Sequence, residues 1–167
     1  MNIRTRLHLG WLSKLGLPCL AALLILVPKA QAASTETPPA HYNLDKSHLA
    51  IDGYDPVGYL TVGKALKGRK DLVVQDHGVS YQFASAENQA LFQKDPSKYK
   101  PAYGGWCATA MAKGEKVEID PTNFKVTQGR VFLFFKAFYG NALKDWLKDE
   151  PAQTTKADAN WKRIAGE

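Results

Sequence analysis

The sequence predicts a small single domain of the α+β class, with two β-hairpins and about three short helices, behind a removable N-terminal signal. Three observations support this fold class. Two pairs of short apolar segments are each separated by a turn that contains glycine, apolar residues recur at helical spacing near the C-terminus, and Ser or Asp stands where helices would begin. The chain has the length of one domain with one hydrophobic core.

The N-terminus has the three parts of a secretory signal peptide in the right order. An apolar run of 13 residues, 15–27, follows a basic start and precedes the small-residue pattern Ala30-Gln31-Ala32. The run is too short to cross a bilayer, which takes about 20 apolar residues. We therefore predict a signal peptide over residues 1–32, cleavage before Ala33, a periplasmic or secreted product and no stable membrane anchor after cleavage.

Cleavage at this point removes most of the excess positive charge. The sequence has 22 basic and 16 acidic residues, and four of the basic ones lie in residues 1–32, which leaves 18 against 16 and a net charge of +2. The remaining basic cluster is typical of a solvated loop; it consists of Lys64, Lys67, Arg69 and Lys70. The charge therefore gives no support for a nucleic-acid partner, and we predict none.

The processed chain keeps a single cysteine. Cys19 lies in the signal, so Cys107 remains alone and no internal disulfide can form. The fold must be stable through packing.

The domain is predicted over residues 42–167, after a flexible lead-in at 33–41 that contains Pro38-Pro39. Segments 72–75 and 79–83 are strand candidates, because apolar and polar residues alternate in the second of them. Residues 76–78 predict a three-residue hairpin loop in which Gly78 takes the left-handed conformation.

Helices and a second hairpin follow along the chain. Ser85 is a candidate N-cap for a helix that buries Leu91 and Phe92, and Asp95-Pro96 can cap a further short turn. The second hairpin is expected over 124–135, with its turn at Gln128-Gly129. An apolar stripe predicts a helix that ends before Pro151, and Trp161 is expected to dock a short C-terminal helix. The stripe consists of Phe138, Ala142, Leu143, Trp146 and Leu147.

Three segments taken in order resemble the YHS-domain family, in the exported branch that carries a Tyr-Gly-Gly-x-Cys-Ala element. They are Gly53-Tyr54-Asp55-Pro56-Val57, the segment from Tyr81 to Tyr99, and Tyr103-Gly104-Gly105-Trp106-Cys107-Ala108. The resemblance extends from about Leu49 to Phe135 and implies a YHS-like fold. It does not carry the family's metal ligands with it, because Gly58, Ala84 and Asn88 occupy the positions where metal-associated members have Cys or His.

Cys107 is the main candidate for chemistry. It follows a Gly-Gly pair that allows the backbone to approach a ligand closely, and three interpretations stay open: a soft-metal ligand, a reactive thiol, or a small buried apolar residue. Met111 shares a helical face with Cys107 if the stretch is helical. His77 completes the candidate metal set, with copper as the candidate cofactor, although these residues lack a metal-binding motif.

The remaining candidates are pocket or ligand-contact residues. They are Asp55, Tyr81, Tyr103, Gly104, Gly105 and Trp106. Asp55 also fits a brace for the turn at Pro56, and the tyrosines fit a core as well as a ligand cage. Because no pairing of Ser, His, Asp or Cys has a recognisable catalytic context, no catalytic residue is assigned.

These observations favour a non-enzymatic, exported binding or accessory module with an unknown ligand or protein partner. Two alternatives remain: a periplasmic protein that handles copper or another soft metal through Cys107, and a thiol-dependent redox protein.

Overall fold

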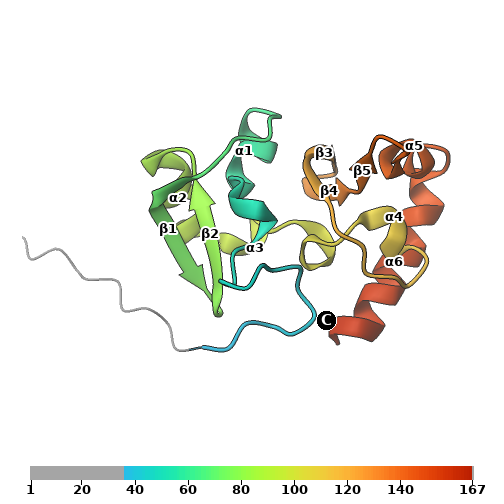
Figure 1. Cartoon of the computed structure of the whole chain (residues 1–167), viewed down its shortest axis with the longest axis horizontal. Helices are drawn as coiled ribbons and strands as arrows, with labels where there is room; N and C mark the ends of the chain where they lie inside the picture. Colours follow the sequence, from blue (N-terminus) through green and yellow to red (C-terminus); the bar gives the residue numbers. More distant parts are fainter. Residues whose placement is uncertain (1–35, 167) are drawn as a thin grey trace, which may run out of the picture. The chain divides into compact units, whose positions relative to one another are not determined.

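The computed structural model describes residues 36–166, so the predicted signal peptide lies outside the described residues. The chain divides into two units, residues 1–31 and 32–167, and every described residue belongs to the second. Across these residues the protein is a small α+β domain with three two-stranded antiparallel sheets and six α-helices. The predicted class is confirmed, whereas two hairpins and three helices were too few (Figure 1).

The first hairpin joins β1 (Arg69–Asp76) to β2 (Val79–Phe83). Asp76 pairs directly with Val79, so the loop has two residues rather than the predicted three. His77 and Gly78 have φ angles of 47° and 76°, and positive φ at both positions defines the type I′ turn that suits the twist of a hairpin. Arg69, predicted in a solvated loop, begins β1 and is exposed.

The second hairpin joins β3 (Asp120–Thr127) to β4 (Arg130–Phe134) and turns at Gln128-Gly129, as predicted. Its first strand begins earlier than expected, because a register shift between Asp120 and Phe124 lets pairing continue past the regular ladder. A third, very short hairpin pairs β5 (Lys136–Ala137) with β6 (Gly140–Asn141).

Capping residues set the starts of the helices in the first half of the chain. Three helices begin directly after a capping residue: α1 (Pro56–Thr61) after Asp55, α2 (Ala86–Lys94) after Ser85, and α3 (Pro96–Tyr99) after Asp95. Each capping side chain accepts a hydrogen bond from a backbone N–H of the first turn. The caps at Ser85 and Asp95 are confirmed. In α2 Phe92 is buried as predicted, but Leu91 is 40% exposed, so that part of the prediction was wrong.

The C-terminal half departs further from the expectation. Three more helices are α4 (Ala108–Met111), α5 (Ala142–Trp146) and α6 (Glu150–Ala165).

The predicted stripe helix is only partly present. Residues 136–141 form β5 and β6, which leaves Phe138 in the turn, fully exposed, while Trp146 is fully buried. The stripe helix ends before Pro151, as predicted, because α5 ends at Trp146. The C-terminal helix is long rather than short: α6 has 16 residues, and Pro151 lies in its first turn, where a missing N–H costs nothing.

Short 3₁₀ turns connect these elements: η1 (Ile51–Gly53) and η2 (Ala102–Gly105). In Figure 1 the hairpin β1–β2 lies beside α1 and α2, whereas α4, α5 and α6 gather near β4. Each group has its own cluster of buried side chains. The first is centred on Tyr59, Tyr81, Phe83 and Phe92, and the second on Met111, Phe132, Phe134 and Trp146. The Tyr59 hydroxyl links α1 to β3 by donating to the Pro121 carbonyl at 2.9 Å.

The described part of the predicted lead-in, residues 36–41, contacts the domain. The backbone of Glu36 and Thr37 lies so close to Gly78 that a side chain there would collide with it. The Glu36 carboxylate is 3.0 Å from Nδ1 of His77, and the His41 carbonyl accepts a hydrogen bond from Nε1 of Trp106 at 2.7 Å.

Candidate functional site

The Tyr103-Gly104-Gly105 segment has an unusual backbone. All three residues have positive φ angles, of 59°, 57° and 88°, a region that costs energy for a residue with a side chain such as Tyr103. Gly104 must be glycine for a second reason: a Cβ there would lie 2.8 Å from Cη2 of Trp161 and 2.9 Å from Cδ1 of Tyr42. Two aromatic rings therefore lie directly against this backbone.

A surface pocket of about 400 Å³ opens beside this turn. We call it the Trp161 pocket, and its principal lining residues are Tyr42, Lys100, Tyr103, Gly104, Arg130 and Trp161. The Trp161 ring centroid lies 6.0 Å from that of Tyr42 and 6.3 Å from that of Tyr103. The pocket therefore combines three aromatic rings with two basic side chains.

Arg130, Asp158 and Tyr103 form one polar network at the edge of this pocket. Nη1 and Nη2 of Arg130 donate to the two carboxylate oxygens of Asp158 at 3.0 and 2.7 Å, and the Tyr103 hydroxyl donates to the same carboxylate at 2.8 Å. Such a bidentate pair is geometrically specific. It joins β4, η2 and α6, and so holds Trp161 in place relative to Gly104.

This network sets the protonation of its members. Partial burial of Asp158 acts to raise its pKa, but the hydrogen bonds from Arg130 and Tyr103 outweigh burial and hold the pKa below its ordinary value. Burial of Tyr103, together with its bond to Asp158, raises the pKa of the phenol well above its ordinary range. Asp158 is therefore ionised and Tyr103 neutral at physiological pH.

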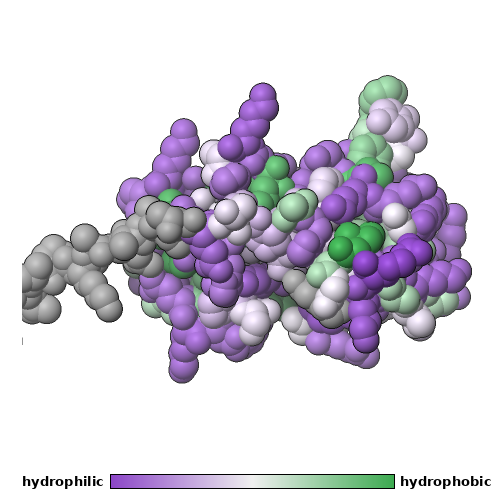
Figure 2. Space-filling model, turned by 90° about the horizontal axis from the view of Figure 1, so that it is seen from below, coloured by the Kyte–Doolittle hydropathy of each residue, from purple (hydrophilic) through white to green (hydrophobic). Residues whose placement is uncertain are grey.

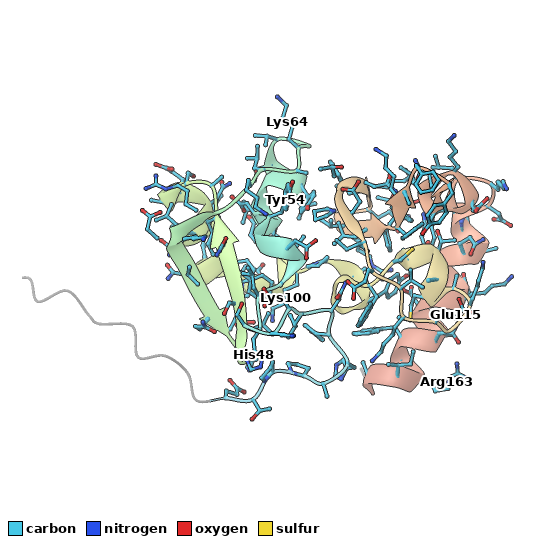
Figure 3. All side chains as sticks on the ribbon, in the orientation of Figure 1. His48, Tyr54, Lys64, Lys100, Glu115 and Arg163 are labelled. Carbon is cyan, nitrogen blue, oxygen red and sulfur yellow. The ribbon has the colours of Figure 1, made fainter. Side chains whose placement is uncertain are left out.

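Lys100 supplies the second cation. Its ammonium group forms an ion pair with Asp76 at the end of β1, and both side chains are largely buried. Figure 3 shows Lys100 beside the lower end of β2, which agrees with this pairing. Among the described residues that line the Trp161 pocket, none is acidic, because Asp76 and Asp158 contact the two cations from outside the lining.

A second pocket of about 330 Å³ lies on the other side of Arg130. We call it the Glu150 pocket; it is lined by Thr127, Gln128, Arg130, Phe132, Glu150, Pro151 and Thr154. Its carboxylate is already engaged, since Glu150 accepts a hydrogen bond from Thr127 at 2.6 Å and pairs with Lys125 at 3.2 Å. Unlike the Trp161 pocket, the Glu150 pocket has an acidic side chain in its lining.

The predicted pocket residues have different roles in the structure. Tyr103 and Gly104 line the Trp161 pocket. Tyr81 and Gly105 border a neighbouring crevice that is too narrow to admit a water molecule. Trp106 is engaged with His41 rather than lining either pocket.

Asp55 is a structural residue, as the alternative interpretation had it. It is fully buried, and its carboxylate accepts hydrogen bonds from the backbone N–H of Val57, the backbone N–H of Ala84 and the side chain of Asn88, at 2.7 to 2.8 Å. It therefore fastens the start of α1 to the junction of β2 and α2.

Cys107 and Met111 lie together as the helical spacing predicts. The Met111 N–H donates to the Cys107 carbonyl at 2.9 Å, and both side chains are buried in the domain. His77 lies instead on the exposed β1–β2 turn, where Glu36, Asp76 and Lys100 act on it. Within residues 36–166 no group of three His, Cys, Asp or Glu side chains is arranged to hold a metal ion. Copper remains a prediction.

Sequence reasoning did not assign Tyr42, Lys100, Arg130, Asp158 or Trp161 to a site. Tyr42, Lys100 and Arg130 come from three separate segments, while Asp158 and Trp161 lie three residues apart on α6. They share no recognisable motif, so only the fold brings these four segments together. The one available signal was the Gly-Gly pair, whose missing side chains indicate that something approaches the backbone at this point.

No helix in the described part of the chain is long and apolar enough to span a membrane. The surface in Figure 2 is mostly hydrophilic, with apolar residues in small separate patches. Comparison with known proteins gives no family: no family model, no curated protein and no solved structure matches the chain.

Proposed function

We propose that the protein is an exported, periplasmic or secreted binding module of the YHS-like type, without enzymatic activity, whose small-molecule ligand occupies the Trp161 pocket. The observation that supports this most directly is the backbone at Gly104, which brings Tyr42 and Trp161 against a pocket of about 400 Å³. Small-molecule sites commonly have this volume, and here three aromatic side chains and two basic ones supply the contacts.

The arrangement favours binding over chemistry. Asp158 and Tyr103 are joined to Arg130 and to each other, so their polar groups already have partners. Cys107 is buried beneath the surface and does not line the Trp161 pocket. A pocket with rigid walls and engaged ionisable groups can select a ligand by shape and charge without transforming it.

The test compares two glycine substitutions. Gly104 and Gly129 both have positive φ angles, of 57° and 76°, but only at Gly104 would a Cβ meet the rings of the pocket, whereas nothing lies within 4 Å of a Cβ at Gly129. Both changes to Ala carry the same kind of backbone strain. We expect Gly104→Ala to weaken the binding of a naphthalene probe at least tenfold, and Gly129→Ala to leave it unchanged.

The experiment uses the full chain expressed with its signal. Recovery of an exported protein that begins at Ala33 tests the location, and calorimetric titration with 1-naphthamide and 1-naphthoate tests binding. If neither probe binds, or if the two glycine variants bind them equally, the proposal of a ligand site at the Trp161 pocket is wrong.

A further inference from the structure

We infer that the ligand of the Trp161 pocket is a planar organic anion, whose ring contacts Tyr42 and Trp161 while its acidic group faces Lys100 and Arg130. This inference rests on the proposed function and adds the chemical class of the ligand. Three features of the pocket carry it: the sign of its charge, the geometry of its rings and the capacity of its cations to form further hydrogen bonds.

The charge of the lining favours an anion. Lys100 and Arg130 both line the pocket, and no acidic residue does so among the described residues. An aromatic pocket without these cations would suit a quaternary ammonium ligand, since ring faces attract positive charge. Two basic side chains in the same wall reverse that preference.

The two cations keep donors for a ligand. A guanidinium has five N–H groups, and Arg130 donates two of them to Asp158. An ammonium has three, and Lys100 forms an ion pair with Asp76. Asp76 and Asp158 therefore fix the positions of the two cations without filling their capacity. Held side chains lose less freedom when an anion binds than mobile ones would.

The rings favour a flat ligand. The Trp161 ring lies 6.0 Å from that of Tyr42 in a tilted arrangement and 6.3 Å from that of Tyr103 in an edge-on one, centroid to centroid. Gly104 has no side chain between the Tyr42 and Trp161 rings, so both rings lie directly against the backbone of this turn. A planar ring can stack on such a surface and gain contact area, whereas a puckered aliphatic ring of equal size makes fewer close contacts.

Three matched probes test the class. 1-Naphthoate is planar and anionic, 1-naphthamide has the same ring without the charge, and decahydronaphthalene-1-carboxylate keeps the charge without the planarity. We expect calorimetric titration to give a dissociation constant for 1-naphthoate at least tenfold below that of either other probe. Its affinity should fall as salt is added, because the ion pairs are screened.

Variants locate the charge effect. The double substitution Arg130→Gln with Asp158→Asn removes the cation without leaving its carboxylate unpaired, and should remove most of the difference between naphthoate and naphthamide. Arg69→Gln with Asp71→Asn is the matched control, because it also removes one arginine and its paired carboxylate, but outside the pocket. It should leave every probe affinity unchanged.

The outcomes separate the two proposals. If 1-naphthoate and 1-naphthamide bind equally well, the anionic class is wrong while the ligand site stands. If the decahydro acid binds as tightly as 1-naphthoate, planarity is wrong. An equal loss of naphthoate affinity in the Arg69 and Arg130 variants would show a general charge effect and overturn the assignment to this pocket. No binding by any probe removes the proposed function as well.

Discussion

At the scale of single residues, Asp55 is the candidate residue with the largest role in stabilising the fold. A carboxylate with no exposure to water is costly unless its oxygens accept hydrogen bonds, and here they accept three. The sequence suggested this role through the turn at Pro56, which Asp55 was expected to brace. It could not reveal the bonds from Ala84 and Asn88, because these residues lie about 30 positions away along the chain.

Asp55→Ala should therefore destabilise the protein by about 3 kcal/mol or more, since it leaves buried donors without acceptors at about 1–3 kcal/mol each. Asp95→Ala is the matched control, because Asp95 also caps a helix that begins with proline but is exposed. It should cost about 1 kcal/mol. Urea unfolding of the two variants measures both values, and equal losses would contradict the role given to Asp55.

At the scale of elements, local sequence signals predicted the two main hairpins and the helix caps well. They predicted poorly those elements whose structure depends on tertiary packing. Gln128-Gly129 and Ser85 act through their own backbone neighbourhood, so their roles could be read from the sequence. Phe138 and Trp146 share a helical stripe in the sequence, yet strand pairing of residues 136–141 separates them. An isolated helix over the predicted stripe and an isolated two-stranded hairpin at 136–141 are both only marginally stable by themselves. Packing against the rest of the domain therefore decides which of them forms.

This separation gives a sharp prediction for two aromatic residues. Trp146 packs against Phe132 and Phe134 at centroid distances of 5.2 and 5.5 Å, so Trp146→Ala should cost about 3–5 kcal/mol through loss of burial and the cavity that remains. Phe138 is fully exposed, so Phe138→Ser should change the free energy of unfolding by no more than about 0.5 kcal/mol. Similar losses in urea unfolding would support the continuous helix instead.

At the scale of the whole molecule, the N-terminal segment is linked to the first hairpin by a titratable contact. The hydrogen bond to Glu36, with the negative charges of Asp76 and Glu36 nearby, raises the pKa of His77 above its ordinary value of 6.5. A raised pKa means that the contact adds stability that is complete below pH 6.5 and is lost as the pH rises through the higher value. The segment should therefore be held more firmly in mild acid.

NMR titration of the His77 ring checks this contact. Glu36→Gln should lower the pKa of His77, because it removes the charge of the bonded carboxylate. Glu87→Gln is the control, since Glu87 is an exposed carboxylate that does not act on His77. A titration midpoint that is the same in the wild type and in Glu36→Gln would show that Glu36 does not hold the imidazole in solution.

The candidate site could be anticipated only at Tyr103 and Gly104, because a glycine pair is a local sign of close approach. Lys100, Arg130 and Trp161 looked like ordinary surface or packing residues in the sequence. They come close together because β4 pairs with β3 and because α6 is long. Neither feature can be predicted from the residues next to them in the sequence.

The C-terminal helix provides walls for both pockets along its 16 residues. Glu150, Pro151 and Thr154 line one pocket near its start, Trp161 lines the other near its end, and Asp158 between them binds the Arg130 that faces both. A ligand that shifts this helix or this arginine at one pocket must alter affinity at the other, and linkage makes the effect reciprocal. The binding of one ligand would therefore change the affinity for a second ligand in the other pocket, although the two ligands do not touch.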